Sequence, residues 1–511
     1  MDTSPNAQQS EVLGASRPGR RRLVALAAPV FAMALLVASC SGSDSEGDAG
    51  SVGGSSADPT EIDAANCPVA ALDAAAEPIE VTVWHAYTTL TKDALEAAAV
   101  QYNASQSKVK VTVEAQGTYE ELLKKYEDSL GNPASLPDVV FAEDTTLQFM
   151  ADSGSIVAAG DCVAADPDAG EFYDGLLPAV QNAYSIEGVL WPAAFGVSMP
   201  IMYLNKDHLT AAGLDPENPP ATLDEVRSAA EAIKAAAIPG VEAPLVMQLY
   251  GWYPENWLTG AQTAIVDEGN GHDAPATTSE FDNDSTTEIF GWLQTMENDG
   301  LLKAYPNSSG IDQFLAMANR SSSILIDGSR AITTVNAIVQ NSYAGDQIEG
   351  AEGIQVDGLN LGVAPVPGLD AAGQGAVAGS AAYLVAGPDD ASIAAGWDFL
   401  TYFNTTAVQV EWTLKGSYLP VTTTVQSDPA ITAYFANDPA GQWLGIVNKQ
   451  LLGVDPDFPG PSIGPYNQFR TGLHAALESV VLNDGDVATT IGEFDARFQA
   501  ELDAYAADVG G

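Results

Sequence analysis

The chain has 511 residues, of which 46% are hydrophobic and 17% are charged. This is the composition of a globular protein, and the length exceeds what one hydrophobic core usually supports, so we expect more than one lobe. With 68 acidic and 19 basic residues, a formal net charge of −49, the chain lacks the cations that nucleic-acid binding requires.

The N-terminus has the features of a bacterial export signal. Three arginines at 20–22 precede "LVALAAPVFAMALLVAS", an apolar run too short and too alanine-rich for a membrane span. It ends in "LVASC", a lipobox, which predicts a lipoprotein signal peptide over 1–39 and lipidation of Cys40. An ordinary signal peptide followed by an incidental cysteine is the alternative. Residues 40–66 lack apolar periodicity, which predicts a flexible tether on the extracytoplasmic side of the cell membrane.

If Cys40 carries a lipid, two cysteines remain, Cys67 and Cys162. Export favours a disulfide between them. The bond would close a loop of about 95 residues, and the loss of chain entropy in the unfolded state would then add roughly 4–5 kcal/mol to the free energy of unfolding. Two free thiols are the alternative. The spacing is not that of a CxxC redox motif.

Strand and helix patterns alternate three times in the next part of the chain. The predicted strands are "IEVTVWHAY" (79–87), "VKVTVEAQG" (109–117) and "PDVVFAED" (137–144). A helix is expected after each strand, the first with Asp93 and Glu96 in capping-box spacing and the second with Thr118 and Glu121. This alternation predicts parallel strands covered by helices.

A second alternating region begins at "SMPIMYLNKD" (198–207). A capping box of Thr222 and Glu225 predicts a helix, and a mainly helical stretch extends to about residue 320. Further expected segments are the strands "SSILIDGS" (322–329) and "AVAGSAAYLVAG" (376–387) and a helix through "AAGWDFLTYFN" (394–404). The region therefore predicts another α/β unit.

Several of these segments resemble a known family when taken together. "VTVWHAY", "YLNKDHLTAAGLDPENPPATLDEV" and "GSYLPVT" are similar to segments of the maltose-binding-like extracellular solute-binding proteins of ABC importers, and most of all to the glycerol-3-phosphate-binding members. The resemblance is discontinuous and covers about 80–480. It implies that "YLNKDHL" lies where the chain passes between lobes.

The resemblance implies an α/β clamshell of the periplasmic-binding-protein type, with two discontinuous lobes and a hinge. The first lobe would comprise 67–197 and 376–412, and the second 198–375 and 413–511. Open α/β sheets bind ligands beyond the carboxyl ends of their strands, so facing lobes would leave a ligand cleft. A ligand that contacts both lobes stabilises the closed form.

Tyr119 and Glu143 follow predicted strands, and the strand-end rule alone directs both toward this cleft. "GTYEE" and "FAEDTT" resemble the family segments that supply a ligand-binding Tyr and Glu. A carboxylate accepts hydrogen bonds from two neighbouring hydroxyls, which suits the end of a polyol. A core tyrosine and a solvated acid are the structural alternatives.

The resemblance adds Ser198, Ser329 and Gly379 as ligand-binding residues. Glycine would allow a backbone N–H to approach an anionic oxygen closely. Trp252 in "YGWYPENWLTG" matches the family tryptophan better than Trp257 does, and it would offer a flat apolar face to a carbon chain or a choline head.

Tyr418 in "GSYLPVT" and Arg470 in "YNQFRTGL" complete the expected ligand set. The planar guanidinium of Arg470 can bind two phosphate oxygens at once. The structural alternative is a helix-surface arginine paired with a nearby acid, as expected in so acidic a chain.

No enzyme motif occurs in the sequence: the G-x-S-x-G elbow, H-E-x-x-H and the phosphate-binding loop are all absent, and the four histidines are scattered. We therefore expect a monomeric binding protein without cofactor or metal, not an enzyme. It would capture glycerol-3-phosphate or a glycerophosphodiester such as glycerophosphocholine and deliver it to ABC-importer permease subunits. An oligosaccharide ligand on the same fold is one alternative, and a secreted hydrolase is another.

Overall fold

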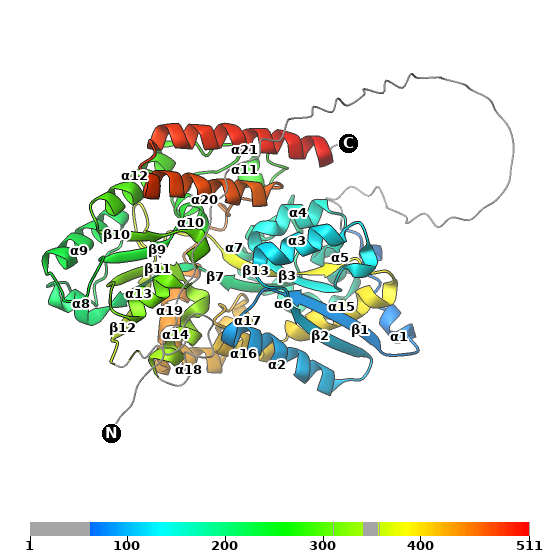
Figure 1. The fold of residues 1–511 in the computed structure, drawn as a ribbon. Coiled ribbons are helices and arrows are strands. Elements are labelled where there is room, and N and C mark those ends of the chain that lie inside the picture. Colours follow the sequence, from blue (N-terminus) through cyan, green and yellow to red (C-terminus); the bar gives the residue numbers. More distant parts are fainter. Residues whose placement is uncertain (1–61, 310, 341–355, 357, 510–511) are drawn as a thin grey trace, which may run out of the picture. The chain divides into compact units, whose positions relative to one another are not determined.

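A computed structural model describes residues 62–509, except 310, 341–355 and 357 (Figure 1). The predicted signal peptide, Cys40 and most of the predicted tether lie outside the described residues. The end of that tether segment is folded: Ala64–Asn66 forms a 3-10 helix, and Asp63 N–H and the Asn66 amide donate to the Asp161 carboxylate at 2.8 and 3.0 Å. The folded part therefore begins a few residues earlier than the composition predicts.

The first sheet has six strands in the order β2-β1-β3-β13-β4, with β7 also paired to β13. The strands are β1 (Ile79–His85), β2 (Val109–Ala115), β3 (Val139–Glu143), β4 (Ile156–Val157), β7 (Ala194–Ser198) and β13 (Ala378–Val385). The predicted parallel pairing is confirmed for β1 with β2 and β3. The late strand β13 runs antiparallel to β3, β4 and β7, so this sheet is mixed.

The second sheet has five strands in the order β10-β9-β11-β8-β12. These are β8 (Pro200–Asn205), β9 (Leu245–Gln248), β10 (Leu302–Tyr305), β11 (Ile324–Gly328) and β12 (Leu361–Pro365). β9 is parallel to β10 and β11, whereas β8 is antiparallel to β11 and β12. A separate two-stranded sheet pairs β5 (Ser185–Ile186) with β6 (Val189–Leu190).

Helices surround both sheets, and each sheet contributes to a buried apolar core. We call the part built on the first sheet the first lobe and the part built on the second sheet the second lobe. Helices of the first part of the chain are α1 (Ala71–Ala74), α2 (Thr89–Ser105), α3 (Tyr119–Ser129), α4 (Leu147–Asp152), α5 (Ala159–Ala165), α6 (Gly170–Asp174) and α7 (Pro178–Ala183). The middle part has α8 (Lys206–Ala211), α9 (Leu223–Ala235), α10 (Trp252–Gly260), α11 (Asp267–Gly271), α12 (Asp284–Asn298), α13 (Asp312–Ala318) and α14 (Ile332–Val339). The last part has α15 (Asp390–Phe403), α16 (Thr406–Gly416), α17 (Thr423–Gln426), α18 (Pro429–Asn437), α19 (Pro439–Leu451), α20 (Tyr466–Asn483) and α21 (Val487–Val509).

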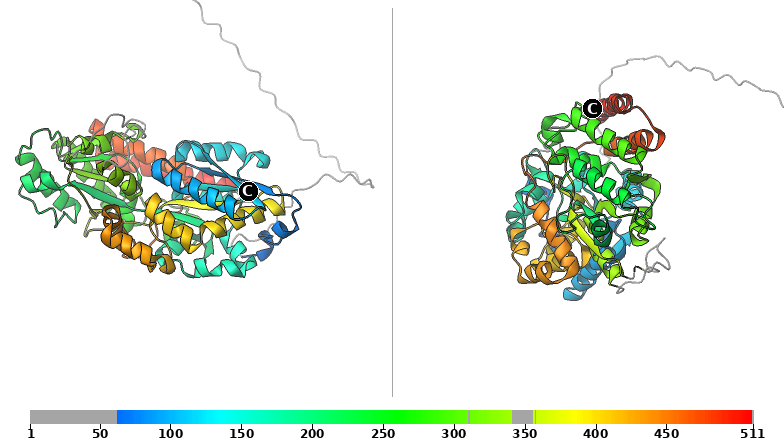
Figure 2. Two further views of the ribbon diagram at one scale, coloured as in Figure 1. Left: turned by 90° about the horizontal axis from the view of Figure 1, so that it is seen from below. Right: turned by 90° about the vertical axis from the view of Figure 1, so that its left-hand side faces the viewer.

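The chain passes between the lobes over a very short distance. Ser198 ends β7 in the first sheet and Pro200 begins β8 in the second, with Met199 alone between them. It returns to the first sheet between β12 and β13. The C-terminal helix α21, shown in red, also reaches the first lobe, where the Tyr505 hydroxyl donates to Asp152 at 2.7 Å (Figures 1 and 2). The exact lobe boundaries remain a prediction.

Local signals explain some helix starts and not others. The capping box at Thr118 is complete, because its side chain accepts from Glu121 N–H at 3.2 Å and its N–H donates to the Glu121 carboxylate at 2.9 Å. The predicted box of Asp93 and Glu96 is wrong, since α2 begins at Thr89, one turn earlier, without a side-chain cap.

The predicted disulfide between Cys67 and Cys162 is confirmed, and both cysteines are buried. It joins the first residues of the folded part to α5 in the first lobe. Within residues 62–509, leaving out the gaps, no helix is both long and apolar enough to cross a membrane.

Candidate functional site

Strand ends of the two sheets meet at a cleft between the lobes. Glu143 is the last residue of β3, and Tyr250 follows β9 after one intervening residue. The Tyr250 hydroxyl donates to Glu143 Oε1 at 2.6 Å, so a side chain of the second lobe contacts a strand end of the first. The placement that the strand-end rule predicts for Glu143 is therefore found.

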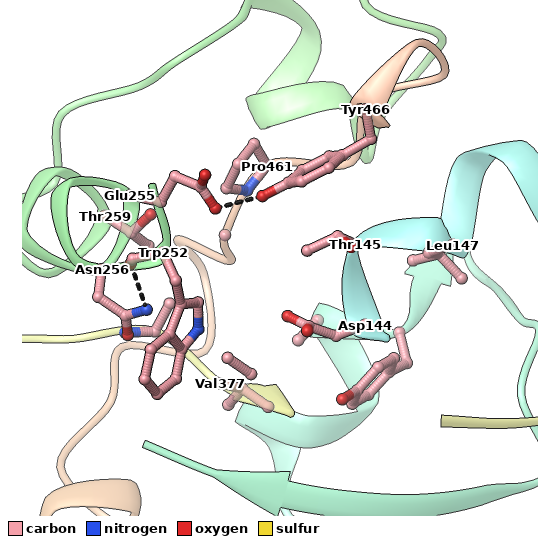
Figure 3. Close-up of a pocket in the computed structure, with 15 residues that line it drawn as sticks. Asp144, Thr145, Leu147, Trp252, Glu255, Asn256, Thr259, Val377, Pro461 and Tyr466 are labelled. Atoms are coloured by element: carbon pink, nitrogen blue, oxygen red, sulfur yellow. Dashed lines mark hydrogen bonds between the residues drawn. The ribbon is translucent and has the colours of Figure 1, made fainter. Parts of the chain in front are cut away.

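Next to this contact lies a small cavity with walls from both lobes (Figure 3). Asp144 and Thr145 line it from the first lobe, Trp252, Glu255 and Tyr466 from the second, and Val377 from the segment that returns to the first sheet. Its volume is about 30 Å³. That is room for about one water molecule, so a larger solute can occupy this cavity only if its walls separate.

Arg470 is buried in the cleft wall and already carries carboxylate partners. Its Nε and Nη2 donate to the two oxygens of Glu255 at 2.9 and 2.8 Å, and Nη1 lies 3.6 Å from Glu143 Oε1. The guanidinium also lies over the ring of Tyr250, 4.7 Å from its centroid. Burial acts to lower the pKa of Arg470, but Glu255 and the neighbouring phenols outweigh it and raise the pKa well above its ordinary value.

This arrangement combines the two sequence interpretations of Arg470. Arg470 is paired with an acid, Glu255, as in the alternative of a surface ion pair. The pair lies inside the cleft, however, and not on the surface of a helix. Nη1 is buried and makes no hydrogen bond to any described residue. One nitrogen of the guanidinium therefore lacks a hydrogen-bond acceptor, and a ligand oxygen can fill that position when the lobes separate.

Two acids that sequence reasoning missed face the same site. Burial, and next the charge of Glu143, raise the pKa of Asp144 to about 8, although Arg470 and the backbone N–H of Gly379 oppose the shift. Burial also raises the pKa of Glu255, against the effect of Arg470 and of the Tyr466 hydroxyl, which donates to it. Asp144 thus holds a proton at neutral pH and can donate as well as accept hydrogen bonds.

The two predicted tyrosines are brought together. Tyr418 is buried after the end of α16 and stacks on Trp412, with ring centroids 5.1 Å apart. Tyr119 is half-buried at the first position of α3. Burial first, and then the adjacent Tyr418 phenol, raise the pKa of Tyr119 well above its ordinary value.

The remaining predicted residues lie in the connections around the cleft. Gly379 has φ +128°, and a Cβ there would lie 2.2 Å from the Gly196 carbonyl oxygen, so only glycine fits. Its N–H faces the Asp144 carboxyl and acts to lower the pKa of that group. The predicted contact of this N–H with a ligand oxygen stays a prediction. Ser198 is buried beside Gly379 in the β7–β13 ladder.

Ser329 and Trp252 differ in what they offer to a ligand. The Ser329 hydroxyl is buried and accepts from Met199 N–H at 3.1 Å, so it also fastens a loop to the crossover. Trp252 lines the cavity, whereas Trp257 is fully buried and donates its indole N–H to the Pro367 carbonyl at 2.8 Å. The choice of Trp252 over Trp257 as the cleft tryptophan therefore agrees with their positions.

Sequence reasoning also missed Tyr250, Tyr466 and Arg330, which lie around the same cleft. Tyr250 and Arg330 each lie within two residues of a strand end, a signal that would have found them. Tyr466 had no such signal, because it comes from the first turn of a helix remote in sequence. Among the residues that the structure describes, no group of three or more His, Cys, Asp or Glu side chains could hold a metal ion.

Known proteins resemble this chain both in sequence and in fold. The sn-glycerol-3-phosphate-binding periplasmic protein UgpB of Rhizobium meliloti is 25% identical over 445 residues, 83% of this chain and 94% of its own. Its counterpart from Pectobacterium atrosepticum is 26% identical over 415 residues, 78% of this chain and 86% of its own.

Two solved structures share the fold at low identity. The GacH receptor of Streptomyces glaucescens, solved unliganded and with acarbose, has a TM-score of 0.68 and 20% identity, covering 84% of this chain and 99% of its own. UgpB of Mycobacterium tuberculosis, in complex with glycerophosphocholine, has a TM-score of 0.66 and 18% identity over the same shares. The predicted two-lobed α/β fold is confirmed.

The sequence profile of one family matches residues 97–440, about two thirds of the chain. The expected family is thereby confirmed, and the relatives carry the names of binding proteins rather than of enzymes. The chain belongs to the bacterial extracellular solute-binding proteins.

Proposed function

We propose that this protein captures glycerol-3-phosphate, or a glycerophosphodiester such as glycerophosphocholine, between its two lobes. The observation that carries the proposal is the convergence of Glu143, Tyr250 and Arg470 from facing lobes, with Tyr119 and Tyr418 at the same cleft. Carboxylate and phenol groups suit the hydroxyls of a glycerol unit, and guanidinium N–H groups suit phosphate oxygens. The names of the sequence relatives support the same ligand class.

The setting of this function follows from the family and from the N-terminal sequence. The protein would be lipid-anchored through Cys40 on the extracytoplasmic side of the membrane and would act as a monomer. It would release its solute to the permease subunits of an ABC importer. A dissociation constant in the micromolar range, about −8 kcal/mol, is tight enough for capture and weak enough for release.

An oligosaccharide is the second candidate ligand, and one observation favours it. Trp252 presents its ring to a cavity that also carries the carboxyl groups of Asp144 and Glu255, and aromatic faces with acids suit sugar rings and hydroxyls. The fold neighbours include a receptor solved with acarbose. In that case Arg470 would serve only to orient Glu255 and Glu143.

A ligand screen by thermal unfolding separates these candidates. We expect stabilisation by glycerol-3-phosphate or glycerophosphocholine, amounting to about 2.7 kcal/mol at a ligand concentration of 100 times the dissociation constant. Stabilisation by maltotriose alone would refute the phosphate ligand and favour the sugar. Product formation from glycerophosphodiesters would instead indicate the hydrolase.

Two variants connect the screen to the site. Arg470→Ala should abolish the response to phosphate esters, but it also leaves Glu255 without its cation and can unfold the protein. Glu143→Gln keeps the shape of the side chain and should weaken the response by removing the charged acceptor. Glu114→Gln, at an exposed position of β2, is the matched control and should respond as the wild type does.

A further inference from the structure

A second arginine lies at a strand end of the second lobe. Arg330 is the middle residue of the 3-10 helix Ser329–Ala331, which follows β11 directly. Its stem lies near Gly328: a Cβ on that glycine would be 4.0 Å from Arg330 Cγ and 3.5 Å from the Trp252 ring. Arg330 and the cleft tryptophan therefore flank the same residue.

The backbone around Arg330 is held on both sides. Before it, Ser329 N–H donates to the Met199 carbonyl at 2.9 Å, and Met199 N–H donates back to the Ser329 hydroxyl at 3.1 Å. After it, Thr333 N–H donates to the Ser417 hydroxyl at 2.9 Å, next to Tyr418. The start of the Arg330 side chain is thus fixed between the lobe crossover and the loop that carries Tyr418.

The guanidinium of Arg330 is not committed to a protein partner. It is exposed, and within the described part of the chain it makes no hydrogen bond and no salt bridge. Asp327, the nearest acid in sequence, accepts from Gly328 N–H at 2.6 Å and from the Gln313 amide at 3.1 Å. Although the side chain is exposed, the surrounding protein removes part of the water around the guanidinium and acts to lower its pKa, whereas Tyr418, Tyr119, Asp327 and Tyr250 together raise it.

Arg330 lines a cavity of about 220 Å³ together with Thr89 of the first lobe and Thr334 of the second, so it lies between the lobes and its side chain is exposed. Arg470 differs, because it is buried and Glu255 occupies two of its nitrogens. An anion that bound Arg470 alone would compete with that buried carboxylate. An anion at Arg330 can accept hydrogen bonds from the five N–H groups of the guanidinium, because none of them donates to an acceptor in the described part of the chain.

We propose that Arg330 is the specificity-determining cation of the cleft, which holds the anionic oxygens of a phosphate monoester or diester. Arg470, in which only Nη1 lacks an acceptor, then contributes one nitrogen to the same phosphate and otherwise keeps Glu143 and Glu255 in place for the hydroxyls of the ligand. This inference rests on the proposed function and adds to it a ligand contact outside the set that the sequence indicates.

Calorimetric titration of Arg330→Gln tests the inference. We expect glycerol-3-phosphate to bind about tenfold to a hundredfold more weakly than to the wild type, the usual effect of losing a charge-assisted contact. Arg330→Lys should recover part of the loss, and added salt should weaken binding less in the Gln variant than in the wild type. Arg497→Gln, at an arginine whose side chain is 48% exposed on α21, is the matched control and should bind normally.

The midpoint of thermal unfolding should be the same for Arg330→Gln and the wild type, because no hydrogen bond or salt bridge within the described residues is lost. If Arg330→Gln binds glycerol-3-phosphate within twofold of the wild type while Glu143→Gln binds it weakly, the role of Arg330 is refuted and the proposed function stands. If the wild type binds neither glycerol-3-phosphate nor glycerophosphocholine, the proposed function is refuted together with this inference.

Discussion

Asp144 is a carboxyl group placed where its charge is unfavourable. It lines the small cavity, lies beside Glu143 in sequence, and has a pKa raised to about 8 by burial first and then by that neighbour. The folded protein therefore binds a proton at this site over a pH range in which the unfolded chain has released it. The contribution of Asp144 to the free energy of unfolding falls as pH rises from about 4 to 8.

Asp144→Asn should remove this dependence, because the amide does not titrate. We expect the variant to gain stability relative to the wild type between pH 5 and pH 9, by at least about 1.4 kcal/mol, the value of one pKa unit. Urea unfolding at the two pH values measures the difference. Asp484→Asn, at an exposed acid outside the cleft, should show no such gain, and a constant offset for Asp144→Asn would contradict the raised pKa.

The sequence was informative for some site residues and not for others. Glu143 and Trp252 lie where strand ends and the family resemblance indicate. Asp144 and Glu255 were missed because nothing local distinguishes a buried acid from a surface acid in a chain with 68 acidic residues. Their environments depend on Arg470, which is more than 200 residues distant from Glu255.

Among the secondary-structure elements, β13 requires glycine at one of its positions. Gly379→Ala would place a methyl group 2.2 Å from the Gly196 carbonyl oxygen, at a φ of +128° that other residues rarely adopt. We expect a loss of about 2 kcal/mol or more in the free energy of unfolding, measured by urea denaturation. Gly291→Ala on α12 has open space around its added methyl group and should instead stabilise the protein by about 0.5–1 kcal/mol. Equal effects of the two variants would contradict this account.

The disulfide fastens the first folded residues to α5 across a separation of 95 residues. We expect reduction to lower the free energy of unfolding by about 2–5 kcal/mol, because the reduced unfolded chain has more conformational freedom. A Cys67→Ser/Cys162→Ser double variant should be equally destabilised and should not respond further to dithiothreitol. If the wild type were insensitive to complete reduction, the bond would have no stabilising role.

Local patterns predicted the early strands and their helices because β1, β2 and β3 pair with close sequence neighbours. The antiparallel placement of β13 and β8 was not predictable in this way. Their neighbours in the sheets include strands far away in the chain, and the alternation of apolar residues carries no information about direction.

At the scale of the whole molecule, the lobes touch through side chains, and we expect these contacts to separate when a solute enters. One such contact joins the hydroxyls of Thr89 on α2 and Thr334 on α14, 3.2 Å apart. A Thr89→Cys/Thr334→Cys variant should form a disulfide on oxidation and hold the lobes together. We expect the oxidised variant to bind glycerol-3-phosphate at least tenfold more slowly than its reduced form, as measured by stopped-flow tryptophan fluorescence.

The Thr89→Cys single variant is the control and should bind at the same rate under both conditions. Equal rates for the oxidised and reduced double variant, with the bond verified by mass spectrometry, would mean that entry does not require separation at this contact.

The attachment of residues 63–67 to α5 has a mechanical consequence. Through the bonds of Asp63 and Asn66 to Asp161, and through the disulfide, the chain enters the folded part entirely on the first lobe. If Cys40 is the membrane anchor, a force transmitted from the bilayer along the chain acts on the first lobe and not on the second. When the lobes open and close, the second lobe would then be the one that moves relative to the membrane. The anchor would not oppose this motion, so thermal motion would be enough to drive it.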